Sequence, residues 1–483
     1  MSKTSKVSAS GINLAELQAQ LSTGSILTDP IELQKRTRDW WPLARLREVR
    51  GDELTRPDAV VMPTTTEEVA NVLRWAYQAN IAIVTRGLGS GVCGGAQPIE
   101  GAIVVDMSAM NQIVALDEIS QIVTVEAGVR GDILEKYLGE QGLTAGHYPQ
   151  SINISTVGGW IAASGAGQAT PAYGPIESRV VGLTVVLYDG IIVNLKPISR
   201  SSAGPDLRRF ILGSEGAFGI ITEAVLACVD VVPGNAWQTF VYPTFDAAID
   251  AGRDMLRAGV GPRVLRGWDV PDSARAFGSF GLEQGCVGMI ALASNAPGLE
   301  GRQAALTEIA ARHGGEPSDP AWGETWWAHR LDAVDLFESV MGTDRTRGDG
   351  IILDTFEVSG LWSDIANLHQ TVGAALREYT DEVRAHYSHV YQVGTALYFT
   401  FVLKGSNDVD VESIYNAAWN AAMNAAVAGG GSISHHHGIG RLKASHMPAE
   451  LGEGGMELLS KVKDALDPKS LLNPGVLLPL REE

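Results

Sequence analysis

Three glycine-rich segments limit the fold of this chain more than any other feature: residues 85–91 (TRGLGSG), 155–167 (STVGGWIAASGAG) and 213–222 (GSEGAFGIIT). Glycine beside β-branched apolar runs lets the backbone turn sharply or approach another group closely. Several amides of such a loop can converge on one anion. One segment alone is equally a tight turn, but three in this order favour a phosphate-binding backbone. None of the three contains G-x-G-x-x-G or G-K-[ST], which disfavours a Rossmann or P-loop site and requires a different dinucleotide cradle.

Composition and charge narrow the class of protein. A chain of 483 residues predicts two domains, and 45% hydrophobic with 19% charged residues is typical of a soluble globular protein. The net charge of −19 argues against nucleic acid or an anionic membrane surface as a partner. Cys93, Cys228 and Cys286 are far apart, which suits a reducing cytosol. Without a signal-peptide core or a bilayer-length apolar run, we expect a cytoplasmic protein with no membrane span.

The stretch around the first glycine-rich segment carries a family resemblance. Residues 56–91 (RPDAVVMPTTTEEVANVLRWAYQANIAIVTRGLGSG) resemble the opening of the flavin domain of vanillyl-alcohol-oxidase-type (PCMH-type) flavoproteins. The resemblance extends to the C-terminus and favours the subgroup of alkyl-dihydroxyacetonephosphate synthase and its bacterial FAD-linked oxidase relatives. The other segments that carry it are 155–160 (STVGGW), 213–216 (GSEG), 356–357 (FE), 397–399 (LYF) and 434–438 (SHHHG).

The resemblance implies an α+β fold in which a PCMH-type FAD-binding domain of two subdomains is followed by an α+β cap domain. The cap domain is expected to contain an antiparallel sheet, as in the C-terminal domain of FAD-linked oxidases. We expect four parts: a helical lead-in (1–52), the FAD-binding domain (53–235), the substrate or cap domain (236–430) and a C-terminal segment that returns to the FAD domain (431–483). Within them, Thr65 or Thr66 is expected to cap a helix, and Asp189-Gly190 is expected to form a hairpin turn.

The resemblance also implies FAD as the cofactor. In several related flavoproteins a histidine of the first loop is bonded covalently to the flavin, but Ser90 stands at that place here, so we expect non-covalent FAD. Cys93 lies close by and is expected to pack as a small hydrophobe. The residues expected to bind FAD are Thr85, Arg86, Gly87, Leu88, Gly89, Ser90, Gly91, Gln150, Ser151, Ser155, Thr156, Gly158, Ser164, Gly165, Gly167, Glu215, Gly219, Ile220 and Ile221.

Three consecutive histidines, His435, His436 and His437, are the second strong signal. Such runs occur in metal-binding tracts, but successive side chains of a strand or tight loop point to opposite sides. Related metal-dependent D-2-hydroxyacid dehydrogenases carry H-x-x-D-G-N-x-H and the glutamate of a G-E-H-G loop. Here the second histidine of the first pattern is missing and His436 replaces the glutamate. We therefore expect no metal site and assign the three histidines to hydrogen bonding or proton transfer beside the flavin.

Tyr398 stands, by the resemblance, where the synthase-type enzymes carry an essential tyrosine. Beside imidazoles it would take the proton of a substrate C–OH, although it could also be a packed strand aromatic. The synthase binds the anionic end of its substrate with an arginine. Arg345 and Arg347 are the nearest candidates and Arg330 is a weaker one, although a solvated position is the commoner one for a loop arginine. A further synthase arginine is replaced by His389, which puts the synthase substrate in doubt.

These features favour an FAD-dependent oxidase or dehydrogenase that transfers hydride from an alcohol or hydroxy acid to flavin N5. O2 or another acceptor would then take the electrons. Two alternatives stay open: a redox-neutral, alkylglycerone-phosphate-synthase-type transferase that uses FAD, and a non-catalytic flavin-binding protein. Tyr398 beside a complete histidine triplet argues against the second. The partners expected are a small-molecule substrate and the electron acceptor, and a homodimer is one assembly open to the chain.

Overall fold

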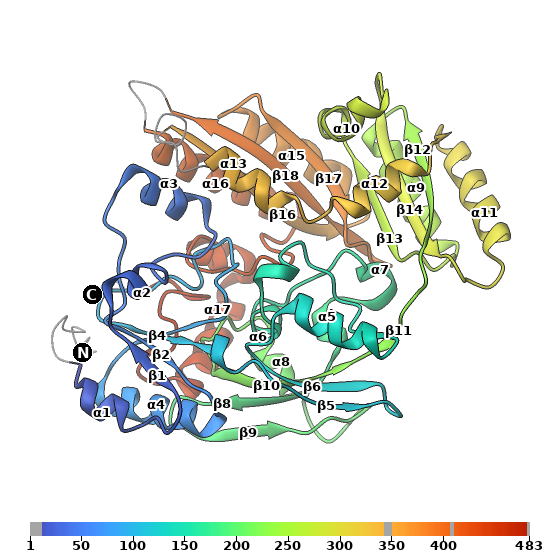
Figure 1. The fold of residues 1–483 in the computed structure, drawn as a ribbon. Coiled ribbons are helices and arrows are strands. Elements are labelled where there is room, and N and C mark those ends of the chain that lie inside the picture. The colour runs from blue at the N-terminus through green and yellow to red at the C-terminus, as the bar shows by residue number, and fades with distance from the viewer. Residues whose placement is uncertain (1–11, 342–349, 406–409, 481–483) are drawn as a thin grey trace.

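Three main β-sheets organise the chain (Figure 1). The computed structural model describes residues 12–341, 350–405 and 410–480. Sheets of four and five strands lie together in the lower half of Figure 1, and a seven-stranded sheet lies above them. Helices pack on these sheets, so the fold is α+β, as the sequence predicted.

The four-stranded sheet carries the first glycine-rich loop at the end of β3. Its three longer strands are parallel and buried on both faces, which explains their continuous apolar sequences. Thr65 accepts a hydrogen bond from the amide of Glu68 and caps α4, as expected. In sheet order the strands are β1 (Ser25–Leu27), β2 (Ala59–Met62), β4 (Ile103–Asp106) and β3 (Ile83–Arg86). The helices of this part are α1 (Leu14–Gln18), α2 (Pro30–Gln34), α3 (Pro42–Arg50), α4 (Thr66–Ala79) and η1 (Met107–Ala109).

The five-stranded sheet is antiparallel throughout and carries the other two glycine-rich segments. Its last hairpin turns at Asp189-Gly190 as predicted, and Gly190 has φ +80°, a left-handed conformation that suits glycine. In sheet order the strands are β5 (Ile113–Asp117), β6 (Ile122–Glu126), β10 (Ile220–Ala227), β8 (Val180–Val186) and β9 (Ile192–Leu195). The shorter elements are α5 (Gly131–Glu140), β7 (Leu143–Thr144), η2 (Ile152–Ile154), α6 (Val157–Ala162), α7 (Thr170–Tyr173), η3 (Ile176–Ser178), α8 (Arg208–Ile211) and β11 (Val229–Asp230).

The seven-stranded sheet, here called the cap sheet, is antiparallel. In sheet order it contains β15 (Glu316–Ser318), β12 (Asn235–Tyr242), β14 (Cys286–Ala293), β13 (Val264–Trp268), β17 (Val383–Ser388), β18 (Gly394–Lys404) and β16 (Ile351–Leu361). Its alternate apolar residues pack beneath α9, α11, α15 and α16 in one large core. The helices of this part are α9 (Phe245–Arg257), α10 (Val270–Phe277), η4 (Gly278–Phe280), α11 (Leu299–Arg312), α12 (Ala321–Ala328), α13 (Ala333–Met341), α15 (Ile365–Arg377) and α16 (Val411–Ala428).

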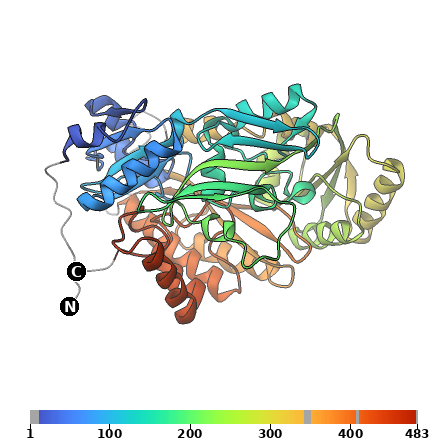
Figure 2. The ribbon, with the colours of Figure 1, turned by 90° about the horizontal axis from the view of Figure 1, so that it is seen from below.

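The last part of the chain returns to the four-stranded sheet. After η5 (Ala444–His446) and α17 (Met447–Leu466), Leu472 forms a bridge with Ile83, and the amide of Asn473 donates to the carbonyl of Ile83. Figure 2, seen from below, shows α17 in red along the edge of the molecule. No helix in the described part of the chain combines the length and apolar character needed to cross a bilayer.

Candidate active site

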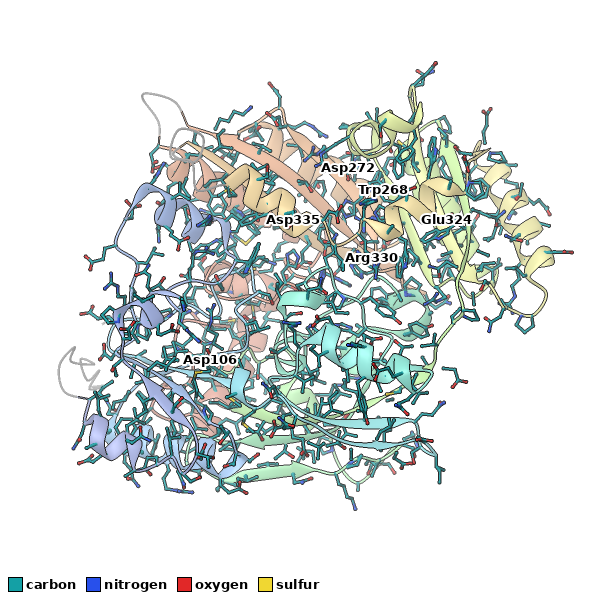
Figure 3. The ribbon with its side chains drawn as sticks, in the orientation of Figure 1. Asp106, Trp268, Asp272, Glu324, Arg330 and Asp335 are labelled. Atoms are coloured by element: carbon teal, nitrogen blue, oxygen red, sulfur yellow. The ribbon has the colours of Figure 1, made fainter. Side chains whose placement is uncertain are left out.

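A cavity of about 570 Å³ lies between the glycine-rich loops and the cap sheet. Two of the residues that line it are labelled in Figure 3: Trp268 at the end of β13 and Asp272 in α10. Arg330, also labelled there, lies after α12 and does not line the cavity. The cavity therefore joins the two parts that the sequence assigned to a cofactor and to a substrate.

Most residues expected to bind FAD line this cavity. They are Thr85, Gly87, Leu88, Gly89, Ser90, Gly91, Gln150, Ser151, Thr156, Gly158, Gly165, Glu215, Gly219 and Ile221. Five others lie behind the lining: Arg86, Ser155, Ser164, Gly167 and Ile220. Arg86, for example, donates to the carbonyl of Arg38, and the hydroxyl of Ser155 accepts a hydrogen bond from the Trp160 indole, so both support the loops instead of facing the cavity.

Residues 89–94 (GSGVCG) do have the spacing G-x-G-x-x-G, across the end of the first glycine-rich segment. In a Rossmann site that spacing opens a helix. Here the chain runs through turns and bends until β4, so the loop belongs to another kind of dinucleotide site.

The cavity has the features that an extended dinucleotide needs. In the described structure the amides of Leu88, Gly89 and Ser90 donate to no protein acceptor, which leaves them for an anion. The glycine backbones also pack tightly: a Cβ at Gly87 would lie 2.4 Å from the Thr156 hydroxyl oxygen.

Two buried polar side chains on the cavity wall, His147 and Gln168, also lack partners. Both ring nitrogens of His147 and both amide atoms of Gln168 make no hydrogen bond among the described residues. Because buried polar groups are normally paired, these atoms indicate a polar ligand in this part of the cavity. FAD fits these residues, and the phosphates would lie against the loop that contains Gly89.

The register of the cap sheet places four side chains in one row, and three of them, Trp268, His386 and Tyr398, line the other half of the cavity. Glu357 on β16 is opposite Tyr398 on β18, Tyr398 is opposite His386 on β17, and His386 is opposite Trp268 on β13. Because strand residues alternate between faces, Leu397 and Phe399 point into the core while Tyr398 points away from it. The rings of Tyr398 and His386 stack, with centroids 4.9 Å apart.

Glu357 organises the histidine triplet. Its fully buried carboxylate accepts hydrogen bonds from the backbone amides of His435, His436 and His437 and lies 3.2 Å from Nζ of Lys443. Burial alone would raise the pKa of Glu357, but Lys443 and the neighbouring histidines lower it to about 2. The triplet is therefore held by an ionised carboxylate as a tight bend and not as a strand.

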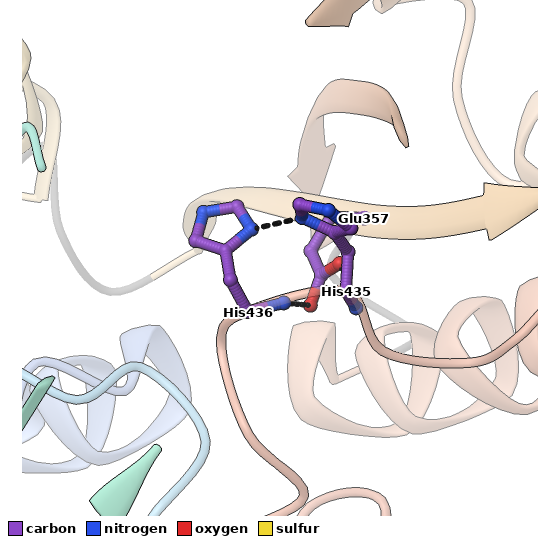
Figure 4. A group of neighbouring side chains, drawn as sticks. All are labelled: Glu357, His435 and His436. Carbon is purple, nitrogen blue, oxygen red and sulfur yellow. Dashed lines mark hydrogen bonds between the residues drawn. The ribbon is translucent and has the colours of Figure 1, made fainter. Parts of the chain in front are cut away.

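This bend brings two histidine rings together, contrary to the expectation that successive rings point apart. The Nδ1 atoms of His435 and His436 lie 2.8 Å apart (Figure 4). One ligand atom from each of Glu357, His435 and His436 lies within 4.8 Å of the others, so a three-ligand group is sterically present. The carboxylate of Glu357 is already paired with amides and a buried ammonium, which opposes a cation there. The absence of a metal therefore stays a prediction.

Tyr398, His436, His437 and His389 all line the cavity, whereas His435 lies one layer behind. The hydroxyl of Tyr398 is hydrogen-bonded to Nε2 of His436. His389 donates from Nδ1 to the carbonyl of Gly167 at 3.0 Å. The structure thus places the predicted tyrosine and two of the three predicted histidines on the cavity wall.

Burial keeps these groups neutral. It raises the pKa of Tyr398 well above its ordinary value and lowers the pKa of His436 well below, an effect to which His437 and His389 add. The pKa of His437 falls to about 4. The histidines are therefore neutral near pH 7 and do not titrate in the near-neutral range expected for an ordinary imidazole.

The sequence suggested three arginines for the anionic end of the substrate, and only one of them lies among the described residues. Arg345 and Arg347 lie outside the described residues. Arg330 packs on Trp327, with its guanidinium carbon 4.0 Å from the centroid of the ring. Among the described residues, the arginines that line the cavity are Arg266, Arg275 and Arg384.

Among these arginines, Arg266 on β13 is the most buried, with 7% of its surface exposed. Nη2 of Arg266 lies 2.5 Å from Nε2 of His386. The other ring nitrogen of His386, Nδ1, lies 3.0 Å from Oδ2 of Asp272. Nε of Arg266 has no hydrogen-bond partner among the described residues. Three carboxylate residues also line the cavity, Glu215, Asp272 and Asp354, and of these Asp272 lies beside the arginines.

Three residues without a predicted role in the site carry most of this geometry: Glu357, Arg266 and His386. The alternation Arg384-Ala385-His386-Tyr387-Ser388 is typical of a strand with one polar face, and it could have revealed β17. Nothing local marks Glu357 as a ligand of a bend almost 80 residues away, since that contact arises only from the fold.

Comparison with known proteins shows the family of the chain. Residues 57–196 match the family described as "FAD binding domain", and residues 236–477 match "FAD linked oxidases, C-terminal domain". The chain is 30% identical to alkyldihydroxyacetonephosphate synthase of Trypanosoma brucei brucei, over 92% of this chain and 76% of that protein. It is 28% identical to glycolate oxidase subunit GlcD of Bacillus subtilis, over 87% and 88% of the two chains. The structure of p-cresol methylhydroxylase with substrate bound superposes with a TM-score of 0.79 at 16% identity, over 97% of both chains, which shows the shared fold.

Proposed function

Because the chain belongs to the FAD-linked oxidases, we propose that it oxidises the C–OH group of a small anionic substrate, such as a 2-hydroxy acid. The observation that carries the proposal is the hydrogen bond between Tyr398 and His436, which line the same cavity as Arg266, Arg275 and Arg384. FAD, when bound, would supply the hydride acceptor, and O2 or another acceptor would take the electrons onward.

The residues of this chain would bind, orient and deprotonate the substrate. Arg266 has an unpaired Nε and would hold the anionic group, while Trp268 and Trp326, each 5.1 Å from its guanidinium, restrict that group to one direction. Tyr398 and His436 would then meet the hydroxyl to be oxidised. A phenol and an imidazole within hydrogen-bond reach are the groups expected for such a proton transfer.

Similarity to the synthase and to glycolate oxidase supports different chemistries for the same site. The synthase relative favours a redox-neutral transfer, and the apolar side of the cavity formed by Trp40, Pro42, Phe337 and Leu353 would accept a hydrocarbon group. We favour oxidation for two reasons. His389 stands where the synthase pattern has an arginine, and the name of the oxidase relative gives a hydroxy acid, glycolate, as its substrate. The redox-neutral transfer stays the second candidate.

Anaerobic titration of the FAD-loaded protein separates these functions. Glycolate, D-lactate, L-lactate and neutral alcohols of the same size would be added in turn, and the absorption of oxidised flavin at about 450 nm would be followed. Loss of absorption with at least one hydroxy acid, and less or none with the neutral alcohols, is the expected result. No bleaching with any of them would contradict oxidation, and turnover of an acyl-glycerone phosphate without bleaching would favour the synthase reaction.

A further inference from the structure

Four side chains form a hydrogen-bonded series that starts at the cavity and leads away from it. Tyr398 contacts Nε2 of His436, the Nδ1 atoms of His436 and His435 are 2.8 Å apart, and Nε2 of His435 is 2.8 Å from the hydroxyl of Tyr391. The first two residues line the cavity and the last two do not. Each contact can join one donor to one acceptor, because a neutral imidazole donates from one nitrogen and accepts at the other.

None of the four groups is suited to keep a proton or a charge. Burial raises the pKa of Tyr398 and of Tyr391 and lowers the pKa of His436 and of His435. Tyr398 is therefore not a phenolate and can take a proton only while its own proton leaves. His436, in turn, is too weak a base to store that proton, which must move on.

We propose that Tyr398, His436, His435 and Tyr391 form a proton relay that carries the hydroxyl proton of the substrate out of the cavity. The proposal rests on the function proposed above. The O–H bond of the substrate breaks and an O–H bond forms on Tyr398, whose own proton passes to Nε2 of His436. The proton on Nδ1 of His436 passes to Nδ1 of His435, and the proton on Nε2 of His435 passes to Tyr391. One proton enters and one leaves, so all four groups end neutral.

The relay ends at a place where a proton can leave. Tyr391 is half-buried, and the two residues after it, Gln392 and Val393, are exposed. The carboxylate of Glu177, in η3 on the opposite side of the domain interface, is close enough to contribute to the raised pKa of Tyr391. Its buried Oε2 has no hydrogen-bond partner in the described structure, and burial raises the pKa of Glu177. Glu177 is therefore a better proton acceptor than an ordinary surface carboxylate, and it lies near enough to Tyr391 for their charges to interact.

Stopped-flow reduction of the FAD-loaded enzyme by glycolate or another hydroxy acid that bleaches the flavin tests the relay. Tyr391→Phe and Glu177→Gln keep the packing of the side chains but remove the exit. Both should slow flavin reduction by about 10- to 100-fold, toward the low end of the range for acid–base groups, and both should increase its solvent deuterium isotope effect. Tyr387→Phe is the matched control, because it removes a hydroxyl bound to the carbonyl of Ala248 on the core face of the same sheet.

A Tyr391→Phe rate and isotope effect equal to those of the Tyr387→Phe control would overturn the relay. A second measurement needs no substrate. In 15N-histidine-labelled, FAD-loaded protein, the ring N–H of His436 should exchange with solvent faster than that of buried His147, and Tyr391→Phe should slow it by the same factor as flavin reduction. Unchanged exchange would also refute the relay. If no alcohol reduces the flavin but exchange slows as expected, the proposed function fails, while proton movement from His436 to Tyr391 is still supported.

Discussion

Replacing Glu357 with glutamine should destabilise the protein through one identifiable contact. The carboxylate is fully buried, accepts three backbone amides of the histidine bend and pairs with Lys443, which is also fully buried. Glutamine has the same shape but carries no charge, and its NH2 group would face amide donors. Glu357→Gln therefore leaves an uncompensated buried ammonium and unsatisfied amides.

The size of the effect follows from that geometry. Removing one partner of a buried ion pair costs about 3–5 kcal/mol, a factor of roughly 10² to 10⁴ in the folding equilibrium. Most of this cost comes from the remaining charge, so Lys443→Met should restore much of it in the double variant. The free energy of the pair is then the coupling measured by a double-mutant cycle.

Urea unfolding of the FAD-loaded protein, followed by tryptophan fluorescence and flavin release, measures these differences. The deficit of Glu357→Gln should be constant near pH 7. Because the pKa of Glu357 is lowered to about 2 by folding, its contribution is present above the ordinary value near 4.5 and is lost as the pH falls toward 2. A loss below about 1 kcal/mol at pH 7, or a double variant no more stable than Glu357→Gln, would refute the reasoning.

Three further predictions concern ligands. Acid precipitation should release all flavin as FAD, since Ser90 cannot form the histidine linkage; flavin retained by the polypeptide, or FMN in solution, would contradict this. Prolonged chelation with EDTA should leave flavin reduction unchanged, because Lys443 already pairs with Glu357, and activity restored by one divalent ion would show the opposite. Arg266→Met should raise KM for a hydroxy acid by at least about 30-fold, equivalent to about 2 kcal/mol, and leave a neutral alcohol little affected; equal effects on both would remove Arg266 from anion binding.

The parts of the fold with local signals could be predicted from the sequence. The Thr65 cap, the Asp189-Gly190 turn and the glycine-rich loops each depend on neighbouring residues, and the structure has them where expected. No continuous apolar run marks β13 or β17 of the cap sheet, because polar residues of both strands face the cavity and interrupt the pattern. The lead-in also contains β1, which is too short to recognise without its partner β2.

In the candidate site, too, only the residues with a local sequence signal could be predicted. Tyr398, His436 and His437 stand out in the sequence and meet at the cavity, whereas no local pattern marks Arg266 as a residue of the cavity wall. Arg266 reaches the cavity only because the register of three strands, β13, β17 and β18, places it on the same face as Tyr398, and register is a property of the whole sheet. The lowered pKa values of the histidines arise likewise from burial, which no local pattern records.

The rate of flavin reduction in Tyr398→Phe tests the central claim most directly. This variant loses only the hydroxyl that contacts His436, so FAD content and thermal stability should match those of the wild type. With a saturating hydroxy acid in an anaerobic stopped-flow instrument, reduction should slow by about 10²- to 10⁴-fold, the usual contribution of a positioned proton-transfer group. A rate within a few-fold of the wild type would show that Tyr398 only packs against its neighbours, and it would contradict the assignment of this cavity wall to proton transfer.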